Sequence, residues 1–137
     1  MTPARRLWAS AVLAAVACGG TDAFSPAPPP PTPPVSERGV LLVSLATEST
    51  EGGAMLLDLT GGPVDSLKGE SGYEAYGNVP ASTATMLVVG NLTSGPIATL
   101  YIPDASRAPS YRVQVREVAA RGTYALRDVS AYGVSLR

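Results

Sequence analysis

The stretch YRVQVR, residues 111–116, alternates strictly between apolar and polar side chains from Arg112 onward. Successive side chains of a β-strand point to opposite faces of a sheet, so this pattern predicts a strand with Val113 and Val115 directed at a core. Arg112 and Arg116 would then face water, as in an antiparallel sheet with one solvated face. A charge placed at Val113 or Val115, such as Val113→Asp, is therefore expected to unfold the domain.

Short apolar runs separated by turn residues lie on both sides of this stretch. Gly61-Gly62-Pro63 and Ser94-Gly95-Pro96 are typical turn sequences. The spacing predicts about seven to nine short strands in a single antiparallel β-sandwich, an all-β fold. Residues 64–72 are open between a loop and a short strand, and residues 122–128 between a loop and one helical turn. The predicted strands are 40–45, 54–59, 73–76, 84–89, 97–102, 111–116 and 132–136.

Two of these runs also predict which residues enter the core. In the run 54–59, Met55, Leu57 and Leu59 fall on one face. The run 40–45 is apolar on both faces at its start, which predicts a central strand.

The first 17 residues resemble a secretory signal peptide. Arg5 and Arg6 form a charged start, and residues 7–17 form an apolar run too short to span a bilayer. Ala15-Val16-Ala17-Cys18 resembles the bacterial lipobox, which implies cleavage before Cys18 and a lipid-modified cysteine at the new N-terminus. Two or three acyl chains on one residue give stable membrane anchoring. The alternative is ordinary cleavage after Ala17, which would leave a free thiol. Gly19 after the cysteine favours the outer membrane over the inner one.

Residues 18–36 form a predicted tether between this anchor and the domain, which we place at residues 37–137. The tether is rich in proline, with Pro28 to Pro31 in an unbroken run. Proline lacks the N–H that a hydrogen-bonded ladder needs, so an extended polyproline II spacer of roughly 25–30 Å is expected. A proline-rich ligand for a recognition domain is the less favoured alternative.

Composition excludes several classes of function. The chain has 10 basic and 11 acidic residues, and loss of Arg5 and Arg6 with the leader leaves a net charge of −3. That charge predicts no nucleic-acid partner. There is no histidine, which removes the commonest general base and zinc ligand, and one cysteine cannot form an intramolecular disulfide. We therefore predict no catalytic residues, no metal site, no cofactor and no enzymatic activity.

The domain resembles the cohesin-type β-sandwich. The resemblance rests on Gly90-Asn91-Leu92-Thr93-Ser94-Gly95-Pro96-Ile97-Ala98, on alternating strands and on Glu117-Val118-Ala119, and extends loosely over residues 39–137. It is also similar to small bacterial lipoproteins with such domains. Because cohesins bind a protein partner through a sheet face, the resemblance implies a binding module.

Candidate binding residues come in three sets, each with a structural alternative. Arg112 and Arg116 are the predicted binding residues, because guanidinium groups bind acidic groups in pairs of hydrogen bonds. Arg107, Arg121 and Arg127 would extend them into a basic face. The alternative is that outward positions on a half-exposed strand are simply polar. The acidic set, Asp58, Asp65, Glu70 and Glu74, lacks calcium-loop spacing and is read as solvated carboxylates.

The tyrosines are read mainly as packing residues rather than a sugar-stacking platform. They are Tyr73, Tyr76, Tyr101, Tyr111, Tyr124 and Tyr132.

Two further motifs are weak. Asn91-Leu92-Thr93 matches a glycosylation sequon but is read as a turn. Ser66 with Lys68 is one residue short of a Ser-x-x-Lys pair.

Taken together, the leader, the tether and the predicted sandwich favour a lipid-anchored module that binds a protein or a cell-wall glycan outside the cytoplasm. A structural envelope lipoprotein, or an accessory subunit of a larger assembly, is the alternative.

Overall fold

The computed structural model describes residues 27–137, so the predicted signal peptide and Cys18 lie outside the described residues. The chain divides into two units, residues 1–33 and 34–137. Residues 27–38 form no helix or strand and are exposed, which is compatible with a proline-rich spacer. Within the described part, no helix is long and apolar enough to cross a membrane.

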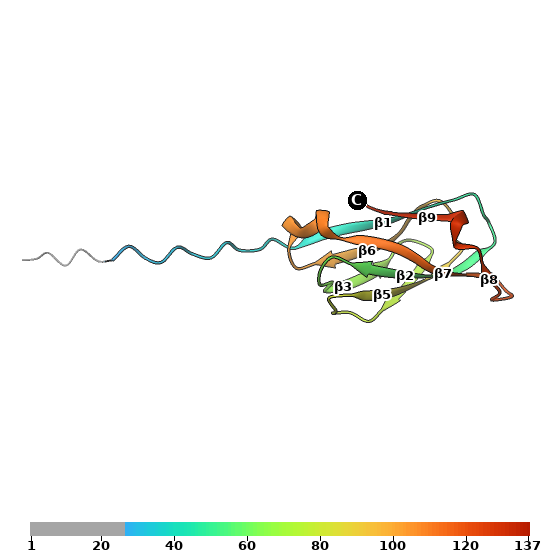
Figure 1. Ribbon diagram of the computed structural model, residues 1–137, viewed down its shortest axis with the longest axis horizontal. Helices are drawn as coiled ribbons and strands as arrows, with labels where there is room; N and C mark the ends of the chain where they lie inside the picture. Colours follow the sequence, from blue (N-terminus) through green and yellow to red (C-terminus); the bar gives the residue numbers. More distant parts are fainter. Residues whose placement is uncertain (1–26) are drawn as a thin grey trace, which may run out of the picture. The chain divides into compact units, whose positions relative to one another are not determined.

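The second unit is an all-β sandwich of two antiparallel sheets, which confirms the predicted fold class (Figure 1). One sheet has the order β3-β6-β1-β9 and the other the order β4-β5-β2-β7-β8. The strands are β1 (Gly39–Thr47), β2 (Gly52–Thr60), β3 (Ser66–Gly69), β4 (Tyr73–Gly77), β5 (Ala84–Gly90), β6 (Gly95–Ile102), β7 (Arg112–Ala120), β8 (Leu126–Arg127) and β9 (Tyr132–Leu136). Two short 3-10 helices, η1 (Ala105–Ser110) and η2 (Val129–Ala131), precede β7 and β9.

The two stretches left open by the sequence hold the additional strands. Residues 64–72 contain β3, and Val64 before it is fully buried and bridges to Ala81. Residues 122–128 contain a turn and the two-residue strand β8 rather than one helical turn. Both strands lie at sheet edges, where two to four residues of pairing leave only a weak sequence signal.

The core lies between the sheets and follows the alternation of the strands. Met55, Leu57 and Leu59 of β2 are buried as predicted. β1 contributes Leu41, Val43 and Leu45 from the opposite sheet. Every residue of the buried core cluster lies between residues 41 and 132, so the unit 34–137 contains a complete core.

The central position of β1 is confirmed, although its outer face is partly exposed. β1 lies between β6 and β9, yet its outward side chain Val40 is 61% exposed. Its apolar outer residues lie beside exposed Tyr101, which pairs with Val40. Apolar character on both sides of β1 therefore accompanies its place inside the sheet and not burial on both sides.

The alternating stretch 111–116 supplies the first part of β7, which has a β-bulge near its middle. Leu57 pairs with Val115 and Leu56 pairs with Glu117, so Arg116 has no partner on β2. The inward direction of Val113 and Val115 is confirmed, because both pack against the core. Both are only partly buried, since β8 pairs with residues 118 and 119 alone and leaves the first half of β7 at an open edge.

Gly61 is the turn residue that the fold depends on most. Its φ is +110°, and a Cβ built there would collide with the backbone of Ser110 and Tyr111. We expect Gly61→Ala to lower the stability of the domain by clearly more than the roughly 1–2 kcal/mol that positive φ alone costs. Gly72→Ala is the matched control, because Gly72 also has positive φ but faces open space. Equal melting temperatures for the two variants would contradict this account of Gly61.

Candidate functional site

The outward-facing side chains of the sheet β4-β5-β2-β7-β8 form a surface that we call the outer face. The strand registers place its residues in cross-strand rows. One row pairs Ala54 with Val89 and with Ala119, and the next pairs Leu56 with Leu87 and with Glu117. Asp58 follows, paired with Thr85 and Gln114. The outer face is therefore apolar toward the start of β2 and polar toward its end.

The apolar part of the outer face holds a groove of about 500 Å³. Its shape follows from side-chain size, because small residues of β2, Gly53 and Ala54, lie beside the larger Leu87 and Val89 of β5. Leu87 is 37% exposed. Leu126 of β8, which pairs with Ala119 in the neighbouring row, is 72% exposed. The lining residues are Gly53, Ala54, Leu87, Val89, Gly90, Ala120, Arg121, Gly122 and Tyr124. A concave apolar surface of this kind is typical of binding sites.

Tyr124 lines this groove from the turn between β7 and β8. Its side chain is 79% exposed and its φ is +57°, while nearby Gly122 also has a positive φ. The left-handed region is costly for a residue with a bulky side chain. A backbone of this kind at an exposed aromatic residue is a feature that clusters at binding sites.

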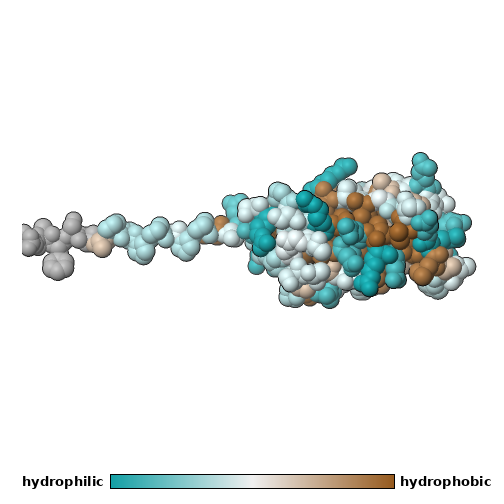
Figure 2. All heavy atoms as spheres, viewed as in Figure 1, coloured by the Kyte–Doolittle hydropathy of each residue, from teal (hydrophilic) through white to brown (hydrophobic). Residues whose placement is uncertain are grey.

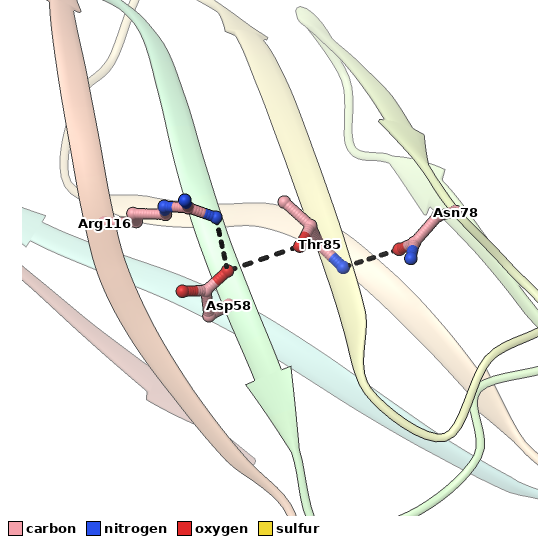
Figure 3. A network of polar contacts seen from close by, with 4 residues as sticks. All are labelled: Asp58, Asn78, Thr85 and Arg116. Atoms are coloured by element: carbon pink, nitrogen blue, oxygen red, sulfur yellow. Dashed lines mark hydrogen bonds and ion pairs between the residues drawn. The ribbon is translucent and has the colours of Figure 1, made fainter.

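The polar part of the outer face is a chain of contacts across three strands and a loop (Figure 3). Asp58 Oδ1 lies 3.7 Å from an Arg116 nitrogen and accepts a 3.3 Å hydrogen bond from the Thr85 hydroxyl. The Thr85 backbone N–H donates to Asn78 Oδ1 at 2.6 Å. Arg116 and Asp58 both remain well exposed, so this ion pair contributes at most about 1 kcal/mol of stability.

Both predicted binding residues lie on β7, but each is engaged within the domain. Arg116 faces Asp58, and Arg112 donates from one nitrogen to the backbone carbonyls of Pro109 and Tyr111 at 2.7 Å each. The other arginines also have partners. Arg107 contacts the Gly61 carbonyl, Arg121 bonds to Asn91 Oδ1 at 2.8 Å, and Arg127 lies 2.7 Å from Glu51. The five therefore extend from η1 to β8 and are not gathered into one basic face.

The acidic set is also dispersed. Asp58 is on β2, Asp65 and Glu70 flank β3, and Glu74 is on β4. Glu70 accepts a hydrogen bond from the Thr99 hydroxyl on the other sheet's outer side. Across residues 27–137, no group of three or more acidic, histidine or cysteine side chains is arranged to hold a metal ion.

The tyrosines divide into bonded packing residues and exposed ones. Tyr111 is buried with its hydroxyl donating to the Pro63 carbonyl, and burial raises the pKa of Tyr111. Tyr73 and Tyr132 donate to Asn91 O at 2.9 Å and Ser49 Oγ at 3.0 Å. Tyr76 on the outer face donates to Glu74 at 2.6 Å, and this hydrogen bond, with the Glu74 charge, raises the pKa of Tyr76.

Neither of the two weak motifs, Ser66 with Lys68 and Asn91-Leu92-Thr93, has a described contact that suggests a catalytic role. Ser66 and Lys68 lie on β3, opposite Tyr101 and Thr99 of β6. Among the described residues the structure gives no hydrogen bond between Ser66 and Lys68. Asn91 lies in the turn after β5, where it accepts from Arg121 and Tyr73.

Comparison with known proteins gives no relative. The chain matches no family model, no curated protein and no solved structure. The resemblance to cohesin-type sandwiches and to bacterial lipoproteins therefore stays a prediction.

Sequence reasoning missed the groove and read Tyr124 mainly as a packing residue, whereas Tyr124 is 79% exposed. The sequence did contain a signal for the β5 side of the groove. The run 84–89 buries Ala84, Met86 and Val88, so Leu87 and Val89 point outward. Two aliphatic residues on the solvent side of a strand indicate an exposed apolar surface. Tyr124 gave no such signal, since its backbone conformation depends on the turn that joins β8 to β7.

Proposed function

We propose that this chain is a lipid-anchored lipoprotein whose β-sandwich binds a protein partner outside the cytoplasm. The lipobox-like sequence before Cys18 and the proline-rich stretch up to residue 36 support the anchor and the tether. A stiff spacer would hold the domain away from the lipid surface, where a partner can reach it.

The observation that carries the binding proposal is the apolar groove of the outer face with exposed Leu87, Leu126 and Tyr124 around it. Exposed aliphatic residues cost free energy in water unless another surface covers them. A protein surface supplies apolar side chains that fill such a groove. A cell-wall glycan is less suited to it, because the groove offers few groups that would hydrogen-bond to sugar hydroxyls.

A cross-linked pull-down from the native envelope tests the proposal. The bait is the intact lipoprotein, with a Cys18→Ala version beside it to separate anchoring from binding. We expect Cys18→Ala to leave the membrane fraction and residues 37–137 alone to retain one saturable protein partner. Enrichment of bulk membrane protein only would reject the binding module and favour the structural envelope lipoprotein. Capture of glycan without protein would reject the protein partner.

A further inference from the structure

β9 has a free edge whose hydrogen-bonding groups can be assigned from its register. Leu42 and Arg137 exchange two backbone hydrogen bonds, at 2.9 and 3.1 Å. Bonded and non-bonded pairs alternate along an antiparallel ladder. Val134 pairs with Leu45 and Leu136 pairs with Val43, so both fall at non-bonded positions. Their N–H and C=O groups therefore point away from β1, and β9 has no second neighbour within the described sheets.

An apolar seam runs beside this edge, between β9 of one sheet and β7 of the other. We define the seam by Val113, Val115, Val134 and Leu136, which all pack on the core and all remain partly exposed. A small groove of about 210 Å³ lies within it. In Figure 2, brown atoms gather in the middle of the domain, where Figure 1 draws β7 and β9 one above the other.

The edge lacks the usual protection against pairing with another strand. Free edges are commonly blocked by charged residues, proline or a bulge. β9 contains no charged residue and no proline, and its register with β1 is regular. By contrast, the open part of β7 carries Arg112, Glu117 and a bulge at Arg116.

We infer that β9 is a strand-addition site for β9 of a second copy of this chain, paired antiparallel about a twofold axis. A register centred on Val134 would let Val134 N–H of each copy donate to Val134 C=O of the other. The seams of the two copies would then meet and exclude water. Charge supports a second copy as the occupant. Arg116 is paired with Asp58, which leaves the Arg112 and Glu117 charges near opposite ends of the open part of β7. A twofold axis directs Arg112 of each copy toward Glu117 of the other.

Val134→Pro tests this inference, because it removes the N–H at the free edge. Proline is tolerated in edge strands where the N–H faces solvent, and the preceding residue, Gly133, accommodates it. The matched control is Ser135→Pro, since Ser135 pairs with Ser44 at a bonded position. The protein used is the chain without leader and cysteine, residues 19–137, and the measurement is sedimentation equilibrium over a wide concentration range.

We expect a monomer–dimer equilibrium for the parent chain and a dimer dissociation constant at least about tenfold higher for Val134→Pro. Val134→Pro should melt close to the parent temperature, whereas Ser135→Pro should melt clearly lower. Leu87→Glu on the outer face should leave the equilibrium unchanged, which separates this site from the proposed partner surface. A parent chain that is monomeric at every concentration, or a dimer that survives Val134→Pro, would overturn the inference. So would a dimer that Leu87→Glu alone dissolves.

Discussion

Val118→Asp is expected to unfold the domain. Val118 is fully buried, pairs with Met55 of β2 and lies after the bulge of β7, where β8 closes the sheet. No basic residue belongs to the core cluster around it, so the carboxylate would have neither water nor a partner. An uncompensated buried charge of this kind costs about 3–5 kcal/mol, a large part of the stability of a small domain. Circular dichroism during thermal unfolding measures the effect.

Val115→Asp is the matched control for that experiment. The strand pattern alone predicts that a charge at Val113 or Val115 unfolds the domain. The structure corrects this for Val115, because Val115 lies at the open seam, where a carboxylate can reach water. We expect a smaller loss of stability and a folded protein. If Val118→Asp melted at or above the temperature of Val115→Asp, the bulge at Arg116 and the edge position of the first half of β7 would be wrong.

Leu87→Glu combined with Val89→Glu is expected to abolish partner capture. Both side chains point outward from β5 and line the groove, so two carboxylates there would prevent an apolar partner surface from entering it. Residues at the centre of an interface contribute about 2 kcal/mol or more each, which is roughly a 30-fold loss of affinity per residue. The measurement is the amount of partner retained by the variant at a fixed bait concentration.

Val40→Glu is the control that tests whether partner capture depends on the outer face rather than on any added charge. Val40 is an exposed aliphatic residue on the outer side of the other sheet, so Val40→Glu adds one carboxylate to an exposed apolar position without touching the groove. All variants should melt near the parent temperature, because the changed side chains are exposed. Equal capture by the double variant and the parent, or loss of capture in Val40→Glu, would contradict the assignment of the binding surface.

The alternation of apolar residues was sufficient to predict the sandwich and most of its core. It identified the inward faces of β2 and β7, because the period of two is imposed by strand geometry. It could not predict the bulge at Arg116 or the short strand β8, and it left β3 open between a loop and a short strand. All three depend on which strands become neighbours. The apolar outer side of β1 predicted its central position correctly, but it does not show whether that side is covered, because coverage is a property of layers and not of one strand.

The candidate site was less predictable than the fold. Arg112 and Arg116 were predicted as binding residues because they face water, and the structure confirms that they do. Their partners within the domain could not be predicted. Arg116 meets Asp58 of another strand, and Arg112 donates to the carbonyls of Pro109 and Tyr111 through the geometry of the turn. The groove forms where residues 53–54, 87–90 and 120–124 meet on one sheet. Such an assembly of distant small and large residues has no local sequence signal.

The most direct test of the binding surface is site-specific photo-cross-linking in the native envelope. A photoreactive side chain at position 87 reports on the groove, and the same side chain at position 40 reports on the opposite face. The account predicts one discrete protein adduct from position 87 and none from position 40. Absence of an adduct at position 87, or the same adduct from both positions, would contradict the proposal that the outer face binds a protein partner.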